Sequence, residues 1–258
     1  MCGIIGIVGK SPVQDRLVES LLRLEYRGYD SAGIAGATAP GIVERRRAQG
    51  KIKALQEVLA TQPLAAHVGI GHTRWATHGA PSERNAHPQT AGRVTLVHNG
   101  IIENFAELRR ELEAEGRTFE SDTDTEVIAQ LLDSHLSRGL APLPALKATL
   151  DRLTGAFALA VLIAGEEDML LGARRGSPLV VGYGEDEMFL GSDALAVGPF
   201  TNRVAYLDEG DYVRIDRTGA QIFDADGAPV TREVRQLARA AAWIASRSSP
   251  AAPPISPA

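Results

Sequence analysis

The only cysteine of this 258-residue chain is Cys2, and its position indicates nucleophilic chemistry. Because the small Cys2 directly follows Met1, the initiator methionine can be removed, which leaves one residue with both a thiol and a free α-amine. A thiol needs a nearby base, and an α-amine with a pKa of about 7.7–8.0, against about 10.4 for lysine, can act as one near pH 7. A lone cysteine is otherwise often a small core residue. The terminal position favours a nucleophile that uses its own amine as general base.

A cysteine–histidine dyad is the competing way to activate a thiol. The chain has six histidines, but it has no internal cysteine on a turn and no His-x-Glu arrangement. Both features are typical of enzymes that use such a dyad. The sequence therefore favours the terminal amine over a histidine as the base.

Polar groups at the end of one expected strand could bind a developing negative charge. His98, Asn99 and Gly100 follow the β-rich run Val94–Val97. Asparagine and glycine in this place often form only a turn. The Asn99 amide and the Gly100 backbone N–H could instead form an oxyanion hole, where one donor contributes about 3–4 kcal/mol to transition-state stabilisation.

Two charged residues are candidates for binding a charged small molecule. Arg74 lies in a loop-like stretch, residues 71–79. Its guanidinium could bind a carboxylate through two parallel hydrogen bonds. Asp124 begins an expected helix, where an acidic residue is also favourable for the helix dipole alone. The helix dipole alone would explain Asp124, and residues 71–79 could be only a surface loop. A binding function for either residue therefore depends on the rest of the pattern.

Apolar runs of strand length outnumber helical patterns and cluster along the chain. This arrangement favours α+β layers over an alternating, doubly wound βα fold. The segment Ser11-Pro12 predicts an N-cap with a first-turn proline, and Thr123–Glu126 has a capping-box pattern. The expected helices are Val13–Tyr26, Glu103–Glu115 (ended by Gly116), Asp124–Leu136, Leu143–Leu153 and Thr231–Ala245. The expected strands are Gly3–Val8, Ile34–Ala37, Ile42–Arg46, His67–Gly71, Val94–His98, Ala156–Ile163, Met169–Ala173, Leu179–Val181, Met188–Leu190, Val204–Tyr206, Tyr212–Ile215 and Ala220–Phe223.

Composition is that of an ordinary globular protein. Hydrophobic residues make up 44% of the chain, and the net charge of -5 gives no sign of a nucleic-acid or membrane surface. No apolar run approaches the roughly 18–20 residues that span a bilayer, and the first ten residues do not resemble a signal peptide. A single cysteine fits a reducing compartment, so we expect a cytoplasmic protein. No metal-ligand spacing and no phosphate-binding loop is present, and we expect no metal and no cofactor.

Taken together, the motifs resemble those of class II (N-terminal nucleophile, or Ntn) glutamine amidotransferases. Within that class they resemble the glutaminase domain of glutamine–fructose-6-phosphate aminotransferases, the isomerizing glucosamine-6-phosphate synthases of amino sugar metabolism. Amidophosphoribosyltransferases and asparagine synthetases share the cysteine start but lack the sequence RWATHG. The matching segments are residues 1–6 (MCGIIG), 24–33 (LEYRGYDSAG), 72–79 (HTRWATHG), 98–104 (HNGIIEN) and 121–126 (SDTDTE).

The resemblance implies a fold and a role for each matching residue. The fold is a four-layer αββα sandwich of two antiparallel sheets, the Ntn hydrolase fold. The chemistry is hydrolysis of L-glutamine to glutamate and ammonia through a γ-glutamyl thioester. The implied roles are Cys2 as nucleophile and base, Asn99 and Gly100 as oxyanion hole, Arg74 for the α-carboxylate, Asp124 for the α-ammonium, Trp75, Thr77 and His78 in a loop over the substrate, and Arg27 as a support for the terminal region.

The resemblance covers only part of such enzymes. We expect a glutaminase domain over residues 1–235, then a helix end and a flexible Pro/Ser/Ala-rich tail over 236–258, without the sugar-phosphate isomerase domains. Ammonia would then go to a synthase- or isomerase-type partner, whether the chain stands alone or is one piece of a larger protein. Two alternatives remain open: a catalytically silent regulatory module that binds glutamine, and an N-terminal nucleophile hydrolase that acts on another amide.

Overall fold

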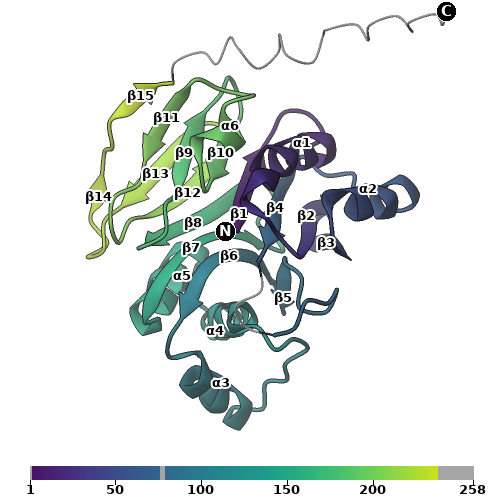
Figure 1. The fold of residues 1–258 in the computed structure, drawn as a ribbon. Coiled ribbons are helices and arrows are strands. Elements are labelled where there is room, and N and C mark those ends of the chain that lie inside the picture. The colour runs from purple at the N-terminus through teal and green to yellow at the C-terminus, as the bar shows by residue number, and fades with distance from the viewer. Residues whose placement is uncertain (1, 76–78, 238–258) are drawn as a thin grey trace, which may run out of the picture.

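Two antiparallel β-sheets pack face to face between two layers of helices in the computed structural model (Figure 1). The structure describes residues 2–75 and 79–237, with the side chain of Arg27 excepted. The four-layer αββα sandwich predicted from the sequence is therefore confirmed.

The first sheet has eight strands in the order β15-β11-β9-β10-β1-β4-β2-β3. Its central strand, β1, lies between β4 and β10 and begins one residue after Cys2. The strands are β1 (Gly3–Val8), β2 (Ser31–Ala39), β3 (Ile42–Gln49), β4 (Val68–Arg74), β9 (Val180–Tyr183), β10 (Met188–Gly191), β11 (Arg203–Tyr206) and β15 (Val234–Gln236).

The second sheet has seven strands in the order β14-β13-β12-β8-β7-β6-β5. Its longest pairing joins β6 to β7 over nine residue pairs, from Val94 opposite Ile163 to Ile102 opposite Gly155. The strands are β5 (Gln89–Ala91), β6 (Val94–Ile102), β7 (Gly155–Ile163), β8 (Met169–Arg175), β12 (Tyr212–Asp216), β13 (Gly219–Phe223) and β14 (Pro229–Val230).

Helices cover the outer face of each sheet. Those against the first sheet are α1 (Gln14–Leu24), the short 3-10 helix η1 (Glu25–Arg27), α2 (Ile52–Thr61) and α6 (Ala194–Val197). Those against the second sheet are α3 (Phe105–Ala114), α4 (Asp124–Ser137) and α5 (Pro142–Arg152). The helix α4 is buried along nearly its whole length, which places its first residues inside the protein.

Three separate apolar clusters fill the three spaces between the layers. Alternate residues of one strand enter different clusters: Ile5 and Ile7 pack toward α1, whereas Ile4 and Val8 pack between the sheets. On β7, Leu159 faces the helices of the second sheet, and its neighbours face the first sheet. Because both faces of these strands are buried, their sequences are continuous apolar runs without polar alternation.

All twelve strands expected from the sequence are present, and four of the five expected helices begin within three residues of the prediction. The prediction missed α2, α6, and the strands β5, β14 and β15. The expected cap at Ser11-Pro12 is wrong, because α1 has Val13 as its N-cap without a side-chain hydrogen bond. Val13 is fully buried, and its N–H donates to the Ala66 carbonyl at 2.9 Å, which holds the chain in place before the helix begins.

The expected helix Thr231–Ala245 is wrong over the part of it that the structure describes. Residues Val234–Gln236 instead form β15, which pairs antiparallel with the edge strand β11. An edge strand offers unpaired backbone donors and acceptors, and their pairing outweighs a weak helical pattern. The remainder of that prediction, with the expected tail, lies outside the described residues.

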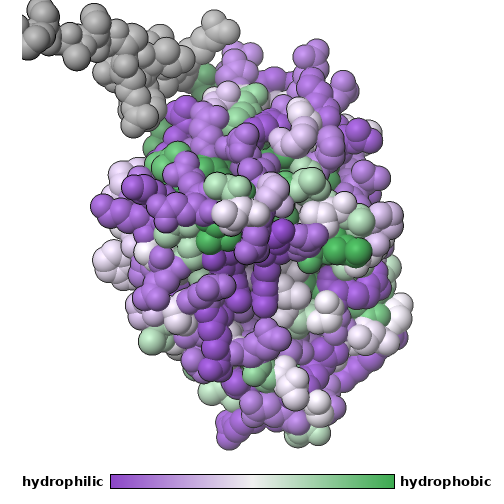
Figure 2. Space-filling view, turned by 90° about the vertical axis from the view of Figure 1, so that its right-hand side faces the viewer, coloured by the Kyte–Doolittle hydropathy of each residue, from purple (hydrophilic) through white to green (hydrophobic). Residues whose placement is uncertain are grey.

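One side of the outer surface is predominantly polar. Figure 2 shows hydrophilic residues over most of one side of the molecule, with hydrophobic residues in small, separated areas. Within residues 2–75 and 79–237, no helix has the length and apolar character that crossing a membrane requires.

Candidate active site

The start of β1 brings the sulfur of Cys2 to the end of β4. The register of these two strands pairs Gly3 with Thr73, so Cys2 lies beside the residues that follow Thr73. The backbone N–H of Trp75 donates to Cys2 Sγ at 3.1 Å, and Sγ lies 3.6 Å from the Trp75 carbonyl oxygen. The thiol is therefore held by backbone atoms 73 residues away in the sequence.

Burial raises the pKa of the Cys2 thiol above its ordinary value. The hydrogen bond from Trp75 and the positive charge of Arg74 act in the opposite direction but do not overcome this effect. The thiol is therefore protonated at neutral pH, and a nucleophilic attack by its sulfur requires a base to take the proton.

Asn99 on β6 lies across from Cys2, at the boundary between the two sheets. Its Nδ2 donates to the backbone carbonyl oxygen of Cys2 at 3.3 Å, and its Oδ1 lies 2.9 Å from His72 Nε2. The Asn99 side chain is 9% exposed, so its amide is fixed by these two partners and not by solvent. The structure thus brings the Asn99 side-chain amide to the backbone of Cys2.

Gly100 follows Asn99 in a backbone conformation that favours glycine. Its φ is +126°, and a Cβ at this position would lie 2.0 Å from the Ala156 carbonyl oxygen of β7. No side chain fits there without a shift of the backbone. The close pairing of β6 with β7 therefore explains why a glycine follows Asn99.

Arg74 is the last residue of β4 and is only 3% exposed. Its Nη2 donates to the Gly79 carbonyl at 3.1 Å, and its Nη1 lies 4.0 Å from Asp30 Oδ1. Burial lowers the pKa of Arg74, and nearby acidic groups, Asp124 among them, oppose this lowering. An arginine remains charged under these conditions, so a buried positive charge lies next to Cys2.

Asp124 is the first residue of α4 and is 4% exposed. Its Oδ2 accepts a hydrogen bond from the backbone N–H of Ile102 at 3.0 Å, which joins the helix to the end of β6. His98 Nδ1 lies 3.9 Å from the other carboxylate oxygen. A buried carboxylate is thus fixed at the end of β6, beyond Asn99 and Gly100.

The remaining predicted residues are described only in part. Trp75 is 56% exposed, and its ring lies against Gly28, where an added Cβ would come within 2.9 Å of it. Arg27 belongs to η1, but its side chain lies outside the described residues. Thr77 and His78 also lie outside the described residues.

The sequence prediction assigned no role to two residues that contact this site. Asp30 bonds through its backbone N–H to the Arg74 carbonyl at 2.7 Å. His72 is fully buried and contacts Asn99. The alternation of a strand offered a signal for His72, because residues i and i+2 share a face and Arg74 was already a candidate.

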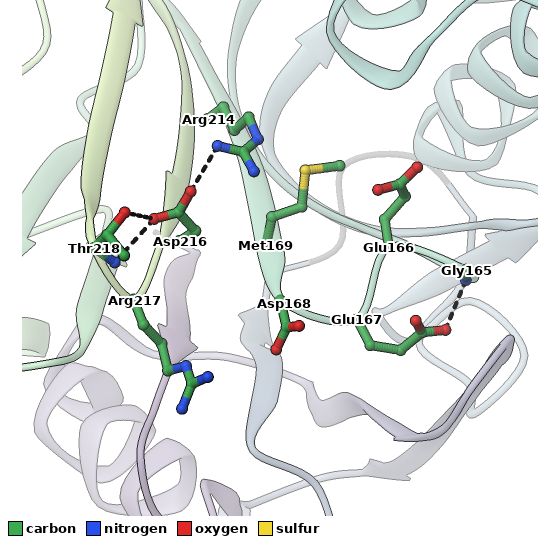
Figure 3. A pocket seen from close by; sticks show the side chains of 9 residues that line it. All are labelled: Gly165, Glu166, Glu167, Asp168, Met169, Arg214, Asp216, Arg217 and Thr218. Carbon is green, nitrogen blue, oxygen red and sulfur yellow. Dashed lines mark hydrogen bonds and ion pairs between the residues drawn. The ribbon is translucent and has the colours of Figure 1, made fainter.

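The surface hollow in Figure 3 is a separate feature. It lies where the Gly165–Met169 segment meets the turn after β12, and an ion pair between Arg214 and Asp216 at 2.6 Å forms one wall. None of the predicted site residues lines it. Within the described part of the chain, no group of three or more histidine, cysteine or acidic residues could hold a metal ion.

Comparisons with known proteins identify the same class as the motifs. A family model described as a glutamine amidotransferase domain matches residues 72–198. The chain is 78% identical over 235 residues to the isomerizing glutamine–fructose-6-phosphate aminotransferase of Caulobacter vibrioides, covering 91% of this chain and 39% of that protein. The Brucella suis protein of the same name is 57% identical over 236 residues, which cover 92% and 39% of the two chains. The chain thus spans about two fifths of the length of these curated relatives.

Solved structures agree on the fold. The glutamine phosphoribosylpyrophosphate amidotransferase of B. subtilis matches with a TM-score of 0.74 and 26% identity, over 87% of this chain and 49% of that one. A glutamine aminotransferase class-II domain protein of Silicibacter pomeroyi matches with a TM-score of 0.57 and 20% identity, over 86% and 99%. With its two stacked antiparallel sheets and its sequence relatives, this chain belongs to the class II glutamine amidotransferases.

Proposed function

We propose that this chain hydrolyses the side-chain amide of L-glutamine, with Cys2 as the nucleophile. The sulfur adds to the amide carbon and forms a tetrahedral oxyanion, which collapses to a γ-glutamyl thioester as the C–N bond breaks and ammonia leaves. Water then attacks the thioester, which releases glutamate and restores the thiol. The observation that carries this proposal is the position of Cys2 Sγ on the Trp75 N–H with the Asn99 amide at the same residue.

The α-amine of Cys2 is the proposed base, once Met1 has been removed. Burial raises the pKa of the thiol, so a base must take its proton before attack. An α-amine with a pKa of about 7.7–8.0 is partly neutral at pH 7 and belongs to the same residue. It would later return the proton to the departing ammonia.

Two fixed donors are proposed to stabilise the oxyanion. The Asn99 amide has two N–H groups, of which one is directed at the Cys2 carbonyl, and the second is available for a substrate oxygen. The Gly100 backbone N–H is the other proposed donor. Each is expected to contribute about 3–4 kcal/mol in the transition state.

Arg74 and Asp124 are proposed to recognise the two charges of the amino acid. A buried guanidinium suits the α-carboxylate, and a buried carboxylate suits the α-ammonium. Trp75, Thr77 and His78 are proposed to lie in a loop that closes over glutamine, and Arg27 to support the terminal region. This recognition of a free amino acid argues against a hydrolase for another kind of amide.

The fate of ammonia belongs to the same proposal. We infer a glutaminase domain over residues 1–235, followed by a Pro/Ser/Ala-rich tail over 236–258, as part of glutamine-dependent glucosamine-6-phosphate synthesis. The support is the high identity to aminotransferases of which the chain spans only 39%. A synthase- or isomerase-type domain or partner protein would take up the ammonia. A cytoplasmic location is part of the proposal, because a nucleophilic thiol is kept free in a reducing compartment.

Incubation of the purified chain with glutamine tests the proposal. We expect glutamate and ammonia in equal amounts from the wild type, and none from Cys2→Ala or Cys2→Ser. A melting temperature of Cys2→Ala close to that of the wild type would serve as the control for folding. Undiminished turnover by Cys2→Ala would contradict the assignment, and glutamine binding without glutamate release would identify a silent regulatory module.

Mass spectrometry of the intact chain tests the role of the amine. Active protein should lack the mass of Met1, and a fraction that retains it should be inactive. A glutamine analogue with an electrophilic γ-carbon should add to the chain once, at Cys2. Full activity in protein that retains Met1 would rule out the α-amine as base.

A further inference from the structure

A fully buried histidine contacts the oxygen of the Asn99 amide, the proposed oxyanion donor, whose nitrogen contacts Cys2. His72 on β4 is 0% exposed, and its Nε2 lies 2.9 Å from Asn99 Oδ1. The two residues come from different sheets, since β4 belongs to the first sheet and β6 to the second. Their contact therefore crosses the interface between the sheets and involves the oxygen of the amide that the proposed reaction uses.

The orientation of the Asn99 amide follows from its two neighbours. The backbone carbonyl of Cys2 can only accept a hydrogen bond, so the Asn99 NH₂ group must face it. The amide oxygen then faces His72 and requires a donor. In the neutral ring only one nitrogen carries a proton, and here that nitrogen must be Nε2.

The surroundings of His72 keep its ring neutral and in place. Burial lowers the pKa of His72 to about 3. The His87 ring packs against it with a centroid distance of 4.3 Å, and His87 Nε2 lies 2.6 Å from the Thr125 hydroxyl on α4. Burial also lowers the pKa of His87 well below its ordinary value. His72 therefore does not gain a proton between pH 5 and 8, and its single donor stays directed at Asn99.

We propose that His72 is a positioning residue, which holds the Asn99 amide with its NH₂ group toward the substrate by donating its Nε2–H to Asn99 Oδ1. This inference rests on the proposed glutaminase function. A rotation of the amide by 180° exchanges its oxygen and nitrogen and would present a carbonyl oxygen to the developing oxyanion. The Cys2 carbonyl alone opposes that rotation weakly, at 3.3 Å. The shorter contact with His72 supplies the stronger preference.

Two substitutions that introduce side chains of similar size separate the effect of hydrogen-bond donation by His72 from the effect of its packing. Glutamine places an N–H near the position of Nε2, whereas methionine fills similar volume without a donor. We expect His72→Met to lower kcat for glutamine hydrolysis about 10- to 100-fold, less than the ~10²–10³-fold typical for removal of an oxyanion donor. KM should change less than threefold, and His72→Gln should recover most of kcat. Thr95 is another buried polar residue of the same strand as Asn99. As a control, Thr95→Val should leave kcat unchanged.

A double-substitution cycle tests whether the effect passes through Asn99. If His72 acts only on that amide, His72→Met should lower kcat by less than twofold in an Asn99→Ala background. If the kcat reductions of the two single variants instead multiply in the double variant, the proposal would be overturned. A wild-type kcat in His72→Met would also overturn it. The wild type in the same assay separates the two hypotheses, because absence of turnover there would refute the glutaminase function and not the positioning role.

A measurement on the unaltered chain covers the case in which His72→Met fails to fold. Nitrogen-15 NMR distinguishes the two neutral tautomers of histidine, and the His72 signal is assigned by its loss in His72→Gln. We expect a protonated Nε2 and an unprotonated Nδ1 from pH 5 to 8. A proton on Nδ1 would overturn the proposal, because Nε2 could then not donate to Asn99.

Discussion

Glutamine carries one positive and one negative charge on its α-carbon, and Arg74 and Asp124 are buried side chains of opposite charge that interact electrostatically with each other. Arg74 is fixed by the Gly79 carbonyl, and Asp124 by the Ile102 N–H. Because each already has a protein partner, neither side chain would have to be ordered for the proposed binding of glutamine. Pre-ordered charges of this kind contribute to affinity with little loss of side-chain entropy.

Substitution of Arg74 should chiefly affect glutamine binding. Hydrogen bonds to charged groups contribute about 1.5–3 kcal/mol, so we expect Arg74→Ala to raise KM about 10- to 100-fold and to reduce kcat much less. Arg74→Lys keeps the charge but loses the two parallel hydrogen bonds. Its KM should therefore lie between those of the wild type and Arg74→Ala. Steady-state kinetics of glutamate release measure both constants. An unchanged KM in Arg74→Ala would contradict the carboxylate-binding role.

Asp124→Asn offers a test with nearly unchanged shape. The asparagine oxygen can still accept from the Ile102 N–H, so the fold should persist while the charge is lost. We expect the wild type to prefer glutamine strongly over glutaramate, which has the same amide and acid but no α-ammonium. Asp124→Asn should lose most of that preference, as measured by the ratio of kcat/KM values. Retention of the full preference would remove Asp124 from substrate recognition.

At the level of single residues, the sequence predicted those with a distinctive position or a motif. Cys2 became a candidate because it would combine a thiol with an α-amine once Met1 is removed, and Asn99 because a glycine follows it after the expected strand. His72 was missed because its proposed role depends on a partner 27 residues away and in the other sheet. Strand alternation placed His72 on the same face as Arg74, but it could not show that His72 meets Asn99 of the other sheet.

Among the elements, the start of α4 has the most consequence for the site, because Asp124 is its first residue. The Thr123 side chain accepts from the Glu126 N–H at 3.3 Å, which is one half of the expected capping box. Glu126 does not return the bond to Thr123; its carboxylate accepts from the Glu120 and Ser121 N–H groups at 2.7 and 2.5 Å. This side chain thus holds the preceding loop and not the cap residue.

Loss of the cap should weaken both stability and binding. We expect Thr123→Ala to reduce the free energy of unfolding by about 1 kcal/mol, the usual effect of an N-cap deletion. Thr123→Ser keeps the hydroxyl and should retain most of the stability. Because Asp124 adjoins the cap, KM for glutamine should rise in Thr123→Ala and not in Thr123→Ser. Chemical denaturation and kinetics on the same samples measure the two effects.

The central strands were predictable because their apolar runs are buried on both faces, as in β1 and β7, which leaves few alternatives for their residues. The exceptions were elements whose conformation depends on distant partners. Strand β15 exists because the edge of β11 is open to it, and its own sequence resembles a helix. The helix α2 was missed although Ile52, Leu55 and Leu59 form one buried face. Their spacing was a usable signal.

For the molecule as a whole, buried histidines link stability to pH. A histidine whose folded pKa lies below its unfolded value of about 6.5 gains protons only on unfolding, so stability is lost as pH falls below 6.5. For His72, with a folded pKa of about 3, this linkage amounts to about 2 kcal/mol between pH 7.5 and 5. The loss continues until pH reaches the folded value.

Denaturation at several pH values checks this expectation. The free energy of unfolding of the wild type should fall from pH 7.5 to 5, and His72→Gln should lose about 2 kcal/mol less over that range. His67→Gln replaces an exposed histidine and serves as the matched control. An identical pH dependence in His72→Gln and wild type would mean that His72 is not held neutral in the folded state.

The central place of β1 also bears on how the protein is made. Its partners β4 and β10 end at residues 74 and 191, so the ribosome must synthesise most of the domain before β1 is enclosed on both sides. At roughly 5–20 residues per second, the first residues would stay accessible for about 10–40 s. An aminopeptidase acting on the nascent chain thus has ample time to expose the Cys2 amine, and it would meet that terminus before the sheet closes around it.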